Sequence, residues 1–567
     1  MTEAVAEPKP AEAPPPKSMK LGERLIDSGL ITPDQLNLAL REQKRTGERV
    51  GEILINLGFV TQEQISSVLA SQAGVAFVQL DAYLIEPSAL KTVPEALARR
   101  HKLIPILLEP PKLTIALANV FDMVAIDEVQ RVTGYVVDAV SATETGIAGA
   151  IDQYYSGGIS FEEIVQKSIR QVEAGRLSEA DMAAGAPIIR LVDQIFLSAV
   201  NDGATDIHME PEERIFRLRY RIDGKLRMGP SLPKILQPAV IARVKILSSM
   251  NIAETRLPQD GKINFYYGKR KIDLRVSTLP TVHGENIVLR VLDKSKLVLG
   301  LEVLGFDEST LARLRKAIES RNGIVTVCGP TGSGKTTTLY SALAYINNVD
   351  RSIITLEDPV EYELPVIRQV QINVKAGLTF SAGLRSILRH DPDVILVGEM
   401  RDAETAELAI RSALTGHLVF STLHTNDAAG AIPRLINMGQ EPFLVASSLR
   451  AIIGQALLRL NCPACREEYE PSPDILARAG LSLDAVKGSV QRGKGCAQCG
   501  QTGYRGRVGV YELMEVTPEI SRLVMRRANA QELLEAAMAE GMTTMRQDGI
   551  AKALRGLTTL EEVVQLT

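Results

Sequence analysis

The stretch "VTVCGPTGSGKTTTLYSAL", residues 325–343, decides the fold of the C-terminal half of this chain. The apolar run at 324–328 predicts a buried strand, and residues 337–343 predict the start of a helix whose N-terminus faces the intervening loop. That loop has the pattern G-x-x-x-x-G-K-T without deviation. A glycine-rich loop between a strand and a helix N-terminus binds the phosphates of a nucleotide, and a chance glycine turn is disfavoured as the alternative.

The residues of this loop have distinct expected roles. Its glycines let backbone N–H groups converge on phosphate oxygens. Lys335 is expected to neutralise the terminal phosphates, and the hydroxyl of Thr336 to ligate Mg²⁺. With ATP and Mg²⁺ as cofactors, the predicted binding set is Gly329, Pro330, Thr331, Gly332, Ser333, Gly334, Lys335, Thr336 and Thr337.

Composition and charge narrow the range of partners. The chain has 567 residues, enough for about three or four domains, and its 45% apolar and 23% charged residues are ordinary for a soluble protein. A net charge of −4 gives no general affinity for nucleic acid or an acidic membrane. The sequence contains no run of about 18 apolar residues, so no membrane span is predicted. The Pro-rich N-terminus, predicted to be disordered at 1–18, lacks the pattern of a signal peptide, so we expect a cytoplasmic protein.

Four of the five cysteines form two close pairs, Cys462-Pro-Ala-Cys465 and Cys496-Ala-Gln-Cys499. Four thiolates in two C-x-x-C segments suit tetrahedral Zn²⁺, and a reducing cytoplasm would keep them from forming disulfides. A redox pair is the competing interpretation, and two tandem pairs favour zinc. Neither pair adjoins the phosphate loop, so a structural role is expected. Cys328, in the strand before the loop, is expected to be a core residue.

Beyond the phosphate loop, buried-strand runs alternate with amphipathic helices, which predicts a parallel sheet with its ligand at the carboxyl ends of the strands. Carboxylates at that edge would hold the metal shell and orient an attacking water. A histidine at that edge either forms a hydrogen bond to the γ-phosphate or only caps the end of a strand. The candidates are Glu357, Asp358 and Glu361 in the run at 352–364, Glu399 in the run at 393–402, and His417 and His424 in the run at 417–427.

Two further polar groups admit a functional and a structural interpretation. In "TDIHMEPEE", Asp206, His208 and Glu210 alternate along one strand face, and they are either metal ligands or, as we favour, a solvated or hydrogen-bonded set. Arg385 and Arg389 are four residues apart, which predicts one face of a helix. This arginine pair is either solvated or acts between subunits.

Together these motifs resemble those of the secretion ATPase superfamily, which powers type II secretion and type IV pilus assembly. The phosphate loop, the acidic segment "TLEDPVEYE", the variant Walker B segment "ILVGEMRD" and the histidine segment "TGHLVFSTLHTN" carry the resemblance over nearly the whole chain. It implies a RecA-like ATPase that forms a homohexamer and contains a four-cysteine zinc insertion at about 460–505. Retraction ATPases of the superfamily lack this insertion and the long N-terminal domain, which favours an extension or secretion motor.

The resemblance also implies roles for single residues. Glu399 would be the catalytic Walker B residue and Glu357 a second catalytic carboxylate. Two arginines of the preceding strand-rich domain would reach the γ-phosphate, while Arg385 and Arg389 would act across the subunit interface. The implied catalytic set is Glu399, Glu357, Lys335, Arg275, Arg290 and His424.

An internal duplication lies near the N-terminus, where residues 20–43 and 49–72 align with nine identities. Each copy predicts a short helix, a glycine stop and a second helix that begins with a T-x-x-Q capping box. A tandem repeat has a pseudo-twofold surface, which suits a ligand that is itself two-fold. The repeated apolar residues, predicted to be core, are Leu25, Ile26, Leu40, Leu54, Ile55 and Leu69.

Helix packing does not explain the matched polar pairs Lys20 with Arg49 and Gln43 with Gln72. The arrangement resembles the N-terminal cyclic di-GMP receptor domain of many secretion and pilus ATPases. The chain has Lys20 where that family usually has arginine, and lysine lacks the planar guanidinium that stacks on guanine and grips phosphate with two hydrogen bonds. The resemblance implies that cyclic di-GMP contacts Lys20, Leu21, Gly22, Gln43, Arg49, Gly51 and Gln72.

The expected fold class is α/β, with a RecA-like P-loop ATPase core preceded by a PAS-like α+β domain and a small N-terminal α+β regulatory domain that contains the helical repeat. The expected boundaries are a disordered tail at 1–18, the regulatory domain at 19–155, a linker at 156–185, the PAS-like domain at 186–295 and the ATPase domain with a helical C-terminus at 301–567.

By this resemblance we expect a motor that hydrolyses ATP to drive pilin polymerisation in type IV pilus assembly under cyclic di-GMP control. Its expected partner is an inner-membrane platform protein, which would recruit it to the membrane without direct contact to nucleic acid. The first alternative is a type II secretion ATPase that drives a pseudopilus. The others are a cyclic di-GMP receptor or scaffold with nucleotide as a structural ligand, and a DNA-transfer motor, which the lack of a basic face disfavours.

Overall fold

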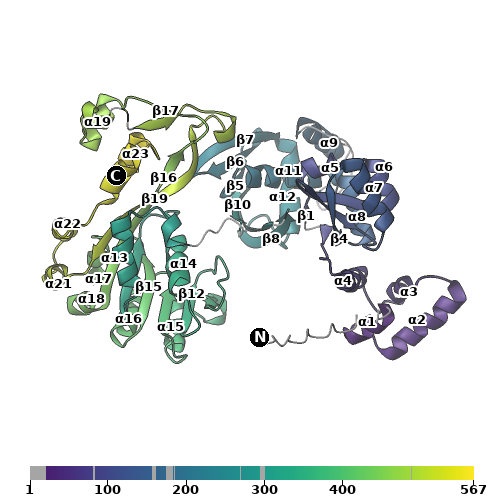
Figure 1. The fold of residues 1–567 in the computed structure, drawn as a ribbon, viewed down its shortest axis with the longest axis horizontal. Helices are drawn as coiled ribbons and strands as arrows, with labels where there is room; N and C mark the ends of the chain where they lie inside the picture. Colours follow the sequence, from purple (N-terminus) through teal and green to yellow (C-terminus); the bar gives the residue numbers. More distant parts are fainter. Residues whose placement is uncertain are drawn as a thin grey trace, which may run out of the picture. The chain divides into compact units, whose positions relative to one another are not determined.

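The computed structural model describes residues 21–80, 83–155, 161–173, 183, 185–268, 270–293, 300–486, 488 and 490–566. They form two compact units, and Figure 1 labels many of their helices and strands. Unit 1 comprises the chain up to Tyr220 together with Met228–Asp293, and unit 2 comprises Arg221–Arg227 and Lys294–Thr567. The predicted tail at 1–18 lies outside the described residues. Among the helices in the described ranges, none is both long and apolar enough to pass through a bilayer.

The duplicated segment of unit 1 folds into two helix pairs, as the repeat predicts. The second helix of each pair begins with a capping box, in which the hydroxyl of Thr32 or Thr61 accepts a backbone N–H at 3.3 Å three residues on. The first helices are followed by Gly29 and Gly58, whose φ angles of 68° and 71° favour glycine. The four helices are α1 (Leu21–Asp27), α2 (Pro33–Thr46), α3 (Val50–Asn56) and α4 (Gln62–Ala73).

The small core of this helical repeat differs from the prediction at one position. Leu25 and Leu54 are fully buried, as expected, but Leu40 is 38% exposed. Its neighbour Ala39 is fully buried instead. Successive helix residues point about 100° apart, so α2 buries a narrow stripe of its surface that includes Ala39 and leaves Leu40 at the edge.

A small α+β domain follows the helical repeat. Its three-stranded sheet has the order β2-β3-β4, with β2 and β3 antiparallel and β3 and β4 parallel. The sheet and its helices share one apolar core. The elements are β1 (Tyr83–Leu84), α5 (Pro87–Leu90), α6 (Glu95–His101), β2 (Leu103–Glu109), β3 (Lys112–Leu117), α7 (Met123–Thr133), β4 (Val136–Ser141) and α8 (Glu144–Tyr154).

The strand-rich domain contains a seven-stranded sheet of order β1-β8-β9-β10-β5-β6-β7. Part of the predicted linker at 156–185 is a helix, α9, which packs on α11 because Ile164 and Ser168 turn toward the interior. The elements are α9 (Phe161–Glu173), α11 (Ala186–Asn201), β5 (Asp206–Pro211), β6 (Ile215–Ile222), β7 (Lys225–Pro233), α12 (Gln237–Leu247), β8 (Gln259–Tyr267), β9 (Arg270–Thr281) and β10 (Gly284–Asp293).

Unit 2 is built on a sheet of order β13-β12-β14-β15-β11-β16-β19, in which only the β16–β19 pair is antiparallel. The buried runs β11, β12, β14 and β15 are therefore parallel neighbours, as predicted. The elements as far as β16 are α13 (Glu308–Ile318), β11 (Gly323–Cys328), α14 (Lys335–Ile346), β12 (Ile353–Glu357), β13 (Arg368–Gln371), α15 (Phe380–Ile387), β14 (Val394–Val397), α16 (Ala403–Leu414), β15 (Leu418–Leu423), α17 (Ala431–Asn437), α18 (Pro442–Ser448) and β16 (Leu449–Asn461).

Helices cover both faces of this sheet, because successive residues of each strand point to opposite sides. Ile324 of β11 packs into the core formed with α15, α16, α17 and α18, whereas Val325 packs into the core formed with α13 and α14. Both cores consist largely of Ile, Leu, Val and Ala. The central strands are therefore buried on both faces, which leaves their ends as the accessible edges of the sheet.

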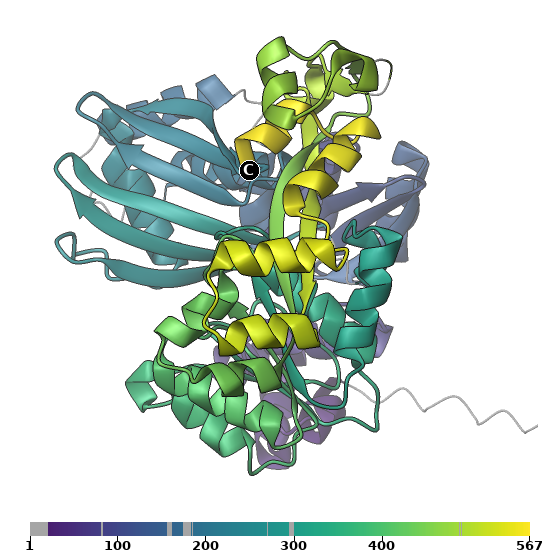
Figure 2. The same cartoon turned by 90° about the vertical axis from the view of Figure 1, so that its left-hand side faces the viewer.

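The antiparallel pair β16 and β19 is long, and C-terminal helices lie along it (Figure 2). Asn461, the last residue of β16, leads directly into Cys462. The remaining elements are β17 (Arg466–Glu468), α19 (Pro473–Ala479), α20 (Leu483–Val486), β18 (Gln491–Gly493), β19 (Tyr504–Glu515), α21 (Pro518–Met525), α22 (Ala530–Ala539), α23 (Met545–Leu554) and α24 (Leu560–Leu566).

Candidate functional site

The phosphate loop connects β11 to α14, as the sequence predicts. Gly329, Gly332 and Gly334 have φ angles of 140°, 81° and 88°, a backbone region in which a Cβ atom is strained. A Cβ on Gly329 would also lie 2.1 Å from the carbonyl oxygen of Gln455. Thr336 is exposed in the first turn of α14, where its hydroxyl is accessible to a metal ion. This cradle of tightly packed backbone fits a bound phosphate chain.

Lys335 is the cation of this loop. Its Nζ donates to the carbonyl oxygens of Gly329 and Pro330, at 2.8 and 2.9 Å. Burial lowers the pKa of Lys335, and the nearby charge of Glu399 opposes that shift. The amine is therefore held inside the loop by weak, neutral acceptors, which a polyphosphate with full negative charges would replace.

Glu399 lies two residues beyond the end of β14, at the same edge of the sheet as the phosphate loop. Its side chain is 12% exposed. One carboxylate oxygen lies 2.6 Å from Nε of Arg401, and the other lies 3.0 Å from Nε2 of His424. A carboxylate fixed between two donors beside a phosphate loop is suited to orient a water molecule for attack on a phosphoryl group.

The two predicted histidines lie at opposite ends of β15. His424 follows the carboxyl end, beside Glu399. His417 precedes the amino end, where its Nδ1 lies 2.8 Å from the carbonyl oxygen of Ser412 in α16. Because β15 runs parallel to β11, only its carboxyl end shares the edge of the phosphate loop. His417 thus lies away from the phosphate loop and bonds α16, whereas His424 lies at its edge beside Glu399, and contact of His424 with the γ-phosphate stays a prediction.

Glu357, the last residue of β12, is only 4% exposed, and three donors hold its carboxylate. Thr355 Oγ1 donates at 2.6 Å, Gln369 Nε2 at 3.1 Å, and the hydroxyl of Tyr340 completes the set. Burial and the Glu357 carboxylate together raise the pKa of Tyr340. In this arrangement Glu357 ties α14, through Tyr340, to β12 and β13. Its catalytic role stays a prediction.

The predicted arginine pair is only partly on one helix. Arg385 lies on α15 and pairs with Glu404, but the helix ends at Ile387, before Arg389. The helix cannot extend beyond His390, because Asp391 precedes a proline and has a φ of 50°, a conformation that no helix continues. Nη1 of Arg389 donates to the backbone carbonyl oxygen of Arg385 at 2.9 Å, so the Arg389 guanidinium lies against the last turn of α15. A role between subunits stays a prediction.

The arginines implied to reach the γ-phosphate belong to unit 1. Arg275 of β9 and Arg290 of β10 are cross-strand neighbours. Nε of Arg290 lies 3.4 Å from Asp206, and two nitrogens of Arg219 bind Glu210 at 2.6 and 2.7 Å. Arginine partners thus occupy these carboxylates, which supports a hydrogen-bonded set over a metal site. Contact of Arg275 and Arg290 with a nucleotide stays a prediction.

The four cysteines after β16 converge, although about thirty residues separate the two pairs. Their sulfur atoms all lie within 4.8 Å of one another, with distances of 3.9 Å for Cys462 to Cys496, 3.9 Å for Cys465 to Cys499 and 3.7 Å for Cys496 to Cys499. A tetrahedron of thiolates at the usual Zn–S distance of about 2.3 Å has edges of about 3.8 Å, so the cluster fits zinc. Cys328 is buried in the core, as expected.

The residues predicted to contact cyclic di-GMP come from both repeats. One of them, Lys20, lies outside the described residues. Arg49 is exposed at the start of α3, and Gln43 donates to the carbonyl oxygen of Glu48 at 3.1 Å. Gly22 is buried, and a Cβ there would lie 2.4 Å from Leu36. Leu21, Gly51 and Gln72 are half-buried. Their contact with a dinucleotide stays a prediction.

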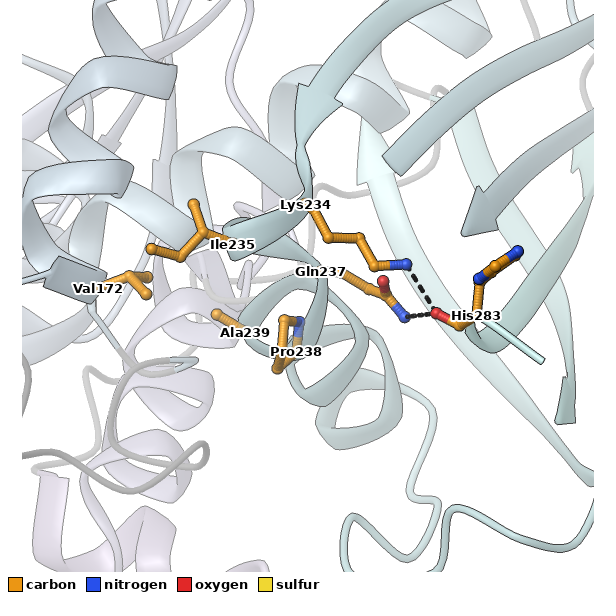
Figure 3. A pocket seen from close by; sticks show the side chains of 7 residues that line it. All are labelled: Val172, Lys234, Ile235, Gln237, Pro238, Ala239 and His283. Carbon is orange, nitrogen blue, oxygen red and sulfur yellow. Dashed lines mark hydrogen bonds between the residues drawn. The ribbon is translucent and has the colours of Figure 1, made fainter. Parts of the chain in front are cut away.

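A cavity in unit 1 contains none of these predicted residues (Figure 3). Lys234 Nζ and Gln237 Nε2 both donate to the carbonyl oxygen of His283, at 2.7 and 3.4 Å. The rest of its lining is apolar: Val172, Ile235, Pro238 and Ala239. None of these lining residues carries a carboxylate or a thiol. The cavity is therefore not a candidate site for phosphoryl transfer.

Sequence reasoning missed two residues that the structure brings to the site. Arg401 pairs with Glu399. Its place two residues after that glutamate in the sequence could have indicated the pair. Gln455 binds the phosphate loop from β16. Its signal was a lone amide in the otherwise apolar run "AIIGQALL".

The chain is similar in sequence to known proteins. The family model described as type II/IV secretion system protein matches residues 181–565, and the MshEN domain model matches 73–160. The type IV pilus assembly ATPase PilB of Myxococcus xanthus is 44% identical over 96% of this chain and 98% of its own length. Type II secretion system protein E of Xanthomonas campestris pv. campestris is 46% identical over 80% and 81%. A solved structure of the pilus retraction motor PilT with bound ADP is 27% identical, covers 66% of this chain and 94% of its own, and has a TM-score of 0.45.

The two histidines of β15 provide a matched pair of variants. We expect His424→Ala to lower the rate of ATP hydrolysis by about ten-fold or more, because Glu399 loses one of its two donors. His417→Ala should stay within about two-fold of the unchanged protein, because that ring lies at the far end of the strand. Steady-state phosphate release measures both rates, and equal losses in the two variants would contradict the assignment.

The cysteine cluster is tested by metal content. We expect about one zinc per chain in the purified protein, and far less in Cys496→Ser, because three thiolates leave the tetrahedron open. Cys328→Ser, which changes the cysteine outside the cluster, should keep its zinc. Elemental analysis with a parallel melting curve decides the question. Full zinc content in Cys496→Ser would show that the cluster does not bind the ion.

Proposed function

The chain belongs to the family of type II/IV secretion system proteins and is a P-loop ATPase, and from that premise we propose that it drives pilin polymerisation in type IV pilus assembly. The observation that carries the choice is the extent of the alignment. The pilus ATPase aligns over nearly the whole chain, including its N-terminal part, while the type II secretion protein aligns over less of it. The alternative is a motor that drives a type II secretion pseudopilus.

The site residues have distinct tasks in hydrolysis. Lys335 and the N-terminus of α14 hold the phosphate chain, and the hydroxyl of Thr336 is the expected protein ligand of Mg²⁺. ATP and Mg²⁺ supply the phosphoryl group and its charge neutralisation when bound. Glu399 orients the attacking water and accepts its hydrogen bond, while His424 fixes the position of that carboxylate. Glu357 braces the helix that begins in the phosphate loop.

The assembly and its location are part of the proposal. We infer a homohexamer, in which Arg385 and Arg389 are exposed and available to a neighbouring subunit. Arg275 and Arg290 are the candidates to respond to the γ-phosphate. The ring would work in the cytoplasm and be recruited to the inner membrane by a platform protein, with no nucleic acid partner. The cysteine cluster would hold a structural Zn²⁺, because its four sulfurs have the required spacing.

Cyclic di-GMP is the proposed regulator. The MshEN match at 73–160 adjoins the helical repeat, and MshE itself, in complex with cdg, is among the similar proteins of known structure. The two capped helix pairs place Gln43 and Gln72 at equivalent positions of the repeat, with Arg49 exposed at the start of α3. Such a repeated polar surface suits a two-fold dinucleotide, and it favours regulation over a purely structural duplication.

Calorimetry on the full chain tests the regulator. We expect Arg49→Ala to weaken cyclic di-GMP binding by about ten-fold or more, because the guanidinium is lost, and Lys20→Arg to strengthen it. Arg45→Ala is the matched control, since Arg45 is an exposed arginine of α2 that pairs with Glu42 outside the predicted set. Absence of heat with the unchanged protein at high micromolar ligand would refute the regulatory proposal and leave the motor proposal intact.

The cargo is tested in the source bacterium. We expect Lys335→Ala to abolish surface pili while secreted enzymes still reach the medium, because the loop can no longer hold ATP. Lys316→Ala, an exposed lysine of α13 in the same unit, is the control. Counts of pili and assays of secreted enzymes in the same cultures give the answer. Normal pili with enzymes retained in the cell would overturn the pilus proposal in favour of the type II alternative.

A further inference from the structure

Gln455 of β16 is a buried amide whose two polar ends are both used. Gln455 is only 2% exposed. Nε2 donates to the carbonyl oxygen of Ser333 at 2.7 Å, and Oε1 accepts from the hydroxyl of Thr338 at 2.7 Å. Ser333 belongs to the phosphate loop and Thr338 to the first turns of α14. One side chain therefore binds the loop and the helix that follows it.

The backbone of Gln455 also lies directly against the loop. Its carbonyl oxygen would be 2.1 Å from a Cβ on Gly329, and its Nε2 would be 3.0 Å from a Cβ on Gly334. Only glycine at these positions allows so close an approach, which gives the two glycines a packing role besides their backbone angles. β16 itself is fixed between β11 and β19.

We propose that Gln455 is a positioning residue of the nucleotide site, which sets the direction of the Gly334 N–H. The peptide group between Ser333 and Gly334 is planar and trans, so its C=O and N–H point in opposite directions. Because Nε2 of Gln455 holds the C=O toward β16, the N–H of Gly334 points away from β16, to the side where a phosphate binds. This inference rests on the proposed nucleotide site and adds a residue to it.

The carbonyl oxygen of Ser333 determines which end of the amide faces the loop, because it can only accept and so requires the NH₂ group. The hydroxyl of Thr338 secures the other end by donating to Oε1. Thr338 is 1% exposed, and its backbone N–H bonds the carbonyl oxygen of Gly334 at 3.1 Å. The loop is thus held in its binding shape before nucleotide arrives, which lowers the ordering cost of binding.

Gln455→Met tests the proposal, because methionine has a similar length and no hydrogen-bonding amide. Gln440→Met is the matched control, since Gln440 is 6% exposed and its Nε2 donates to the carbonyl oxygen of Ala403 at 3.0 Å, outside the loop. We expect Gln455→Met to raise the Kd of a fluorescent ATP analogue and the KM for ATP by about ten-fold, with kcat within about three-fold. Gln440→Met should leave Kd and KM unchanged, while the melting temperature falls in both variants.

Thr338→Val provides the second variant if Gln455→Met does not fold. We expect a smaller loss of affinity, about three-fold, because the amide loses only the contact that secures its oxygen end, and little further loss when both changes are combined. Equal Kd values in Gln455→Met and Gln440→Met, or additive effects of Gln455→Met and Thr338→Val, would overturn the proposal. Failure of the unchanged protein to bind the analogue more tightly than Lys335→Ala would instead refute the nucleotide site itself.

Discussion

The carboxyl edge of the parallel sheet in unit 2 is the constraint on which the site depends. β12, β14, β15, β11 and β16 run in the same direction, so each delivers its last residues to one edge. The phosphate loop, Glu399 and His424 all follow strands at this edge. Residues almost a hundred positions apart in the chain therefore reach one edge of the sheet without any long loop to carry them.

Buried polar contacts hold this edge in shape. Glu357 links α14 to β12 and β13, and Gln455 links the phosphate loop to β16. The polar atoms of both side chains have partners within the protein, and a buried polar group without a partner costs about 1–3 kcal/mol. The loop is thus braced on two sides, while the side chains of Thr336 and His424 remain exposed.

Local patterns predicted much of this arrangement. Continuous apolar runs gave the four parallel strands, and the capping boxes of the helical repeat gave the starts of α2 and α4, because each depends on residues within one short segment. The end of α15 before Arg389 and the exposure of Leu40 were missed. The limit of α15 has a local signal in Asp391 before a proline, whereas the exposure of Leu40 depends on packing between segments, which periodicity alone does not show.

The site residues also divide into those that a local sequence pattern predicts and those that depend on the fold. The glycine-rich loop, the carboxylates after the strands and the two cysteine pairs have signatures in sequence, whereas the separation of His417 from His424 needed the direction of β15. Gln455 had a signal only in its contrast with the strand around it. Its partner Ser333 is more than a hundred residues away, and no spacing rule connects them.

We assign Glu399 to the hydrolysis of ATP and not to its binding. The most direct measurement mixes Glu399→Gln with radiolabelled ATP and Mg²⁺, separates the protein from free nucleotide, and identifies the label that remains bound. Glutamine keeps the size of the side chain and removes its charge, so we predict bound ATP that persists unhydrolysed. Bound ADP, formed at the rate of the unchanged protein, would contradict this role.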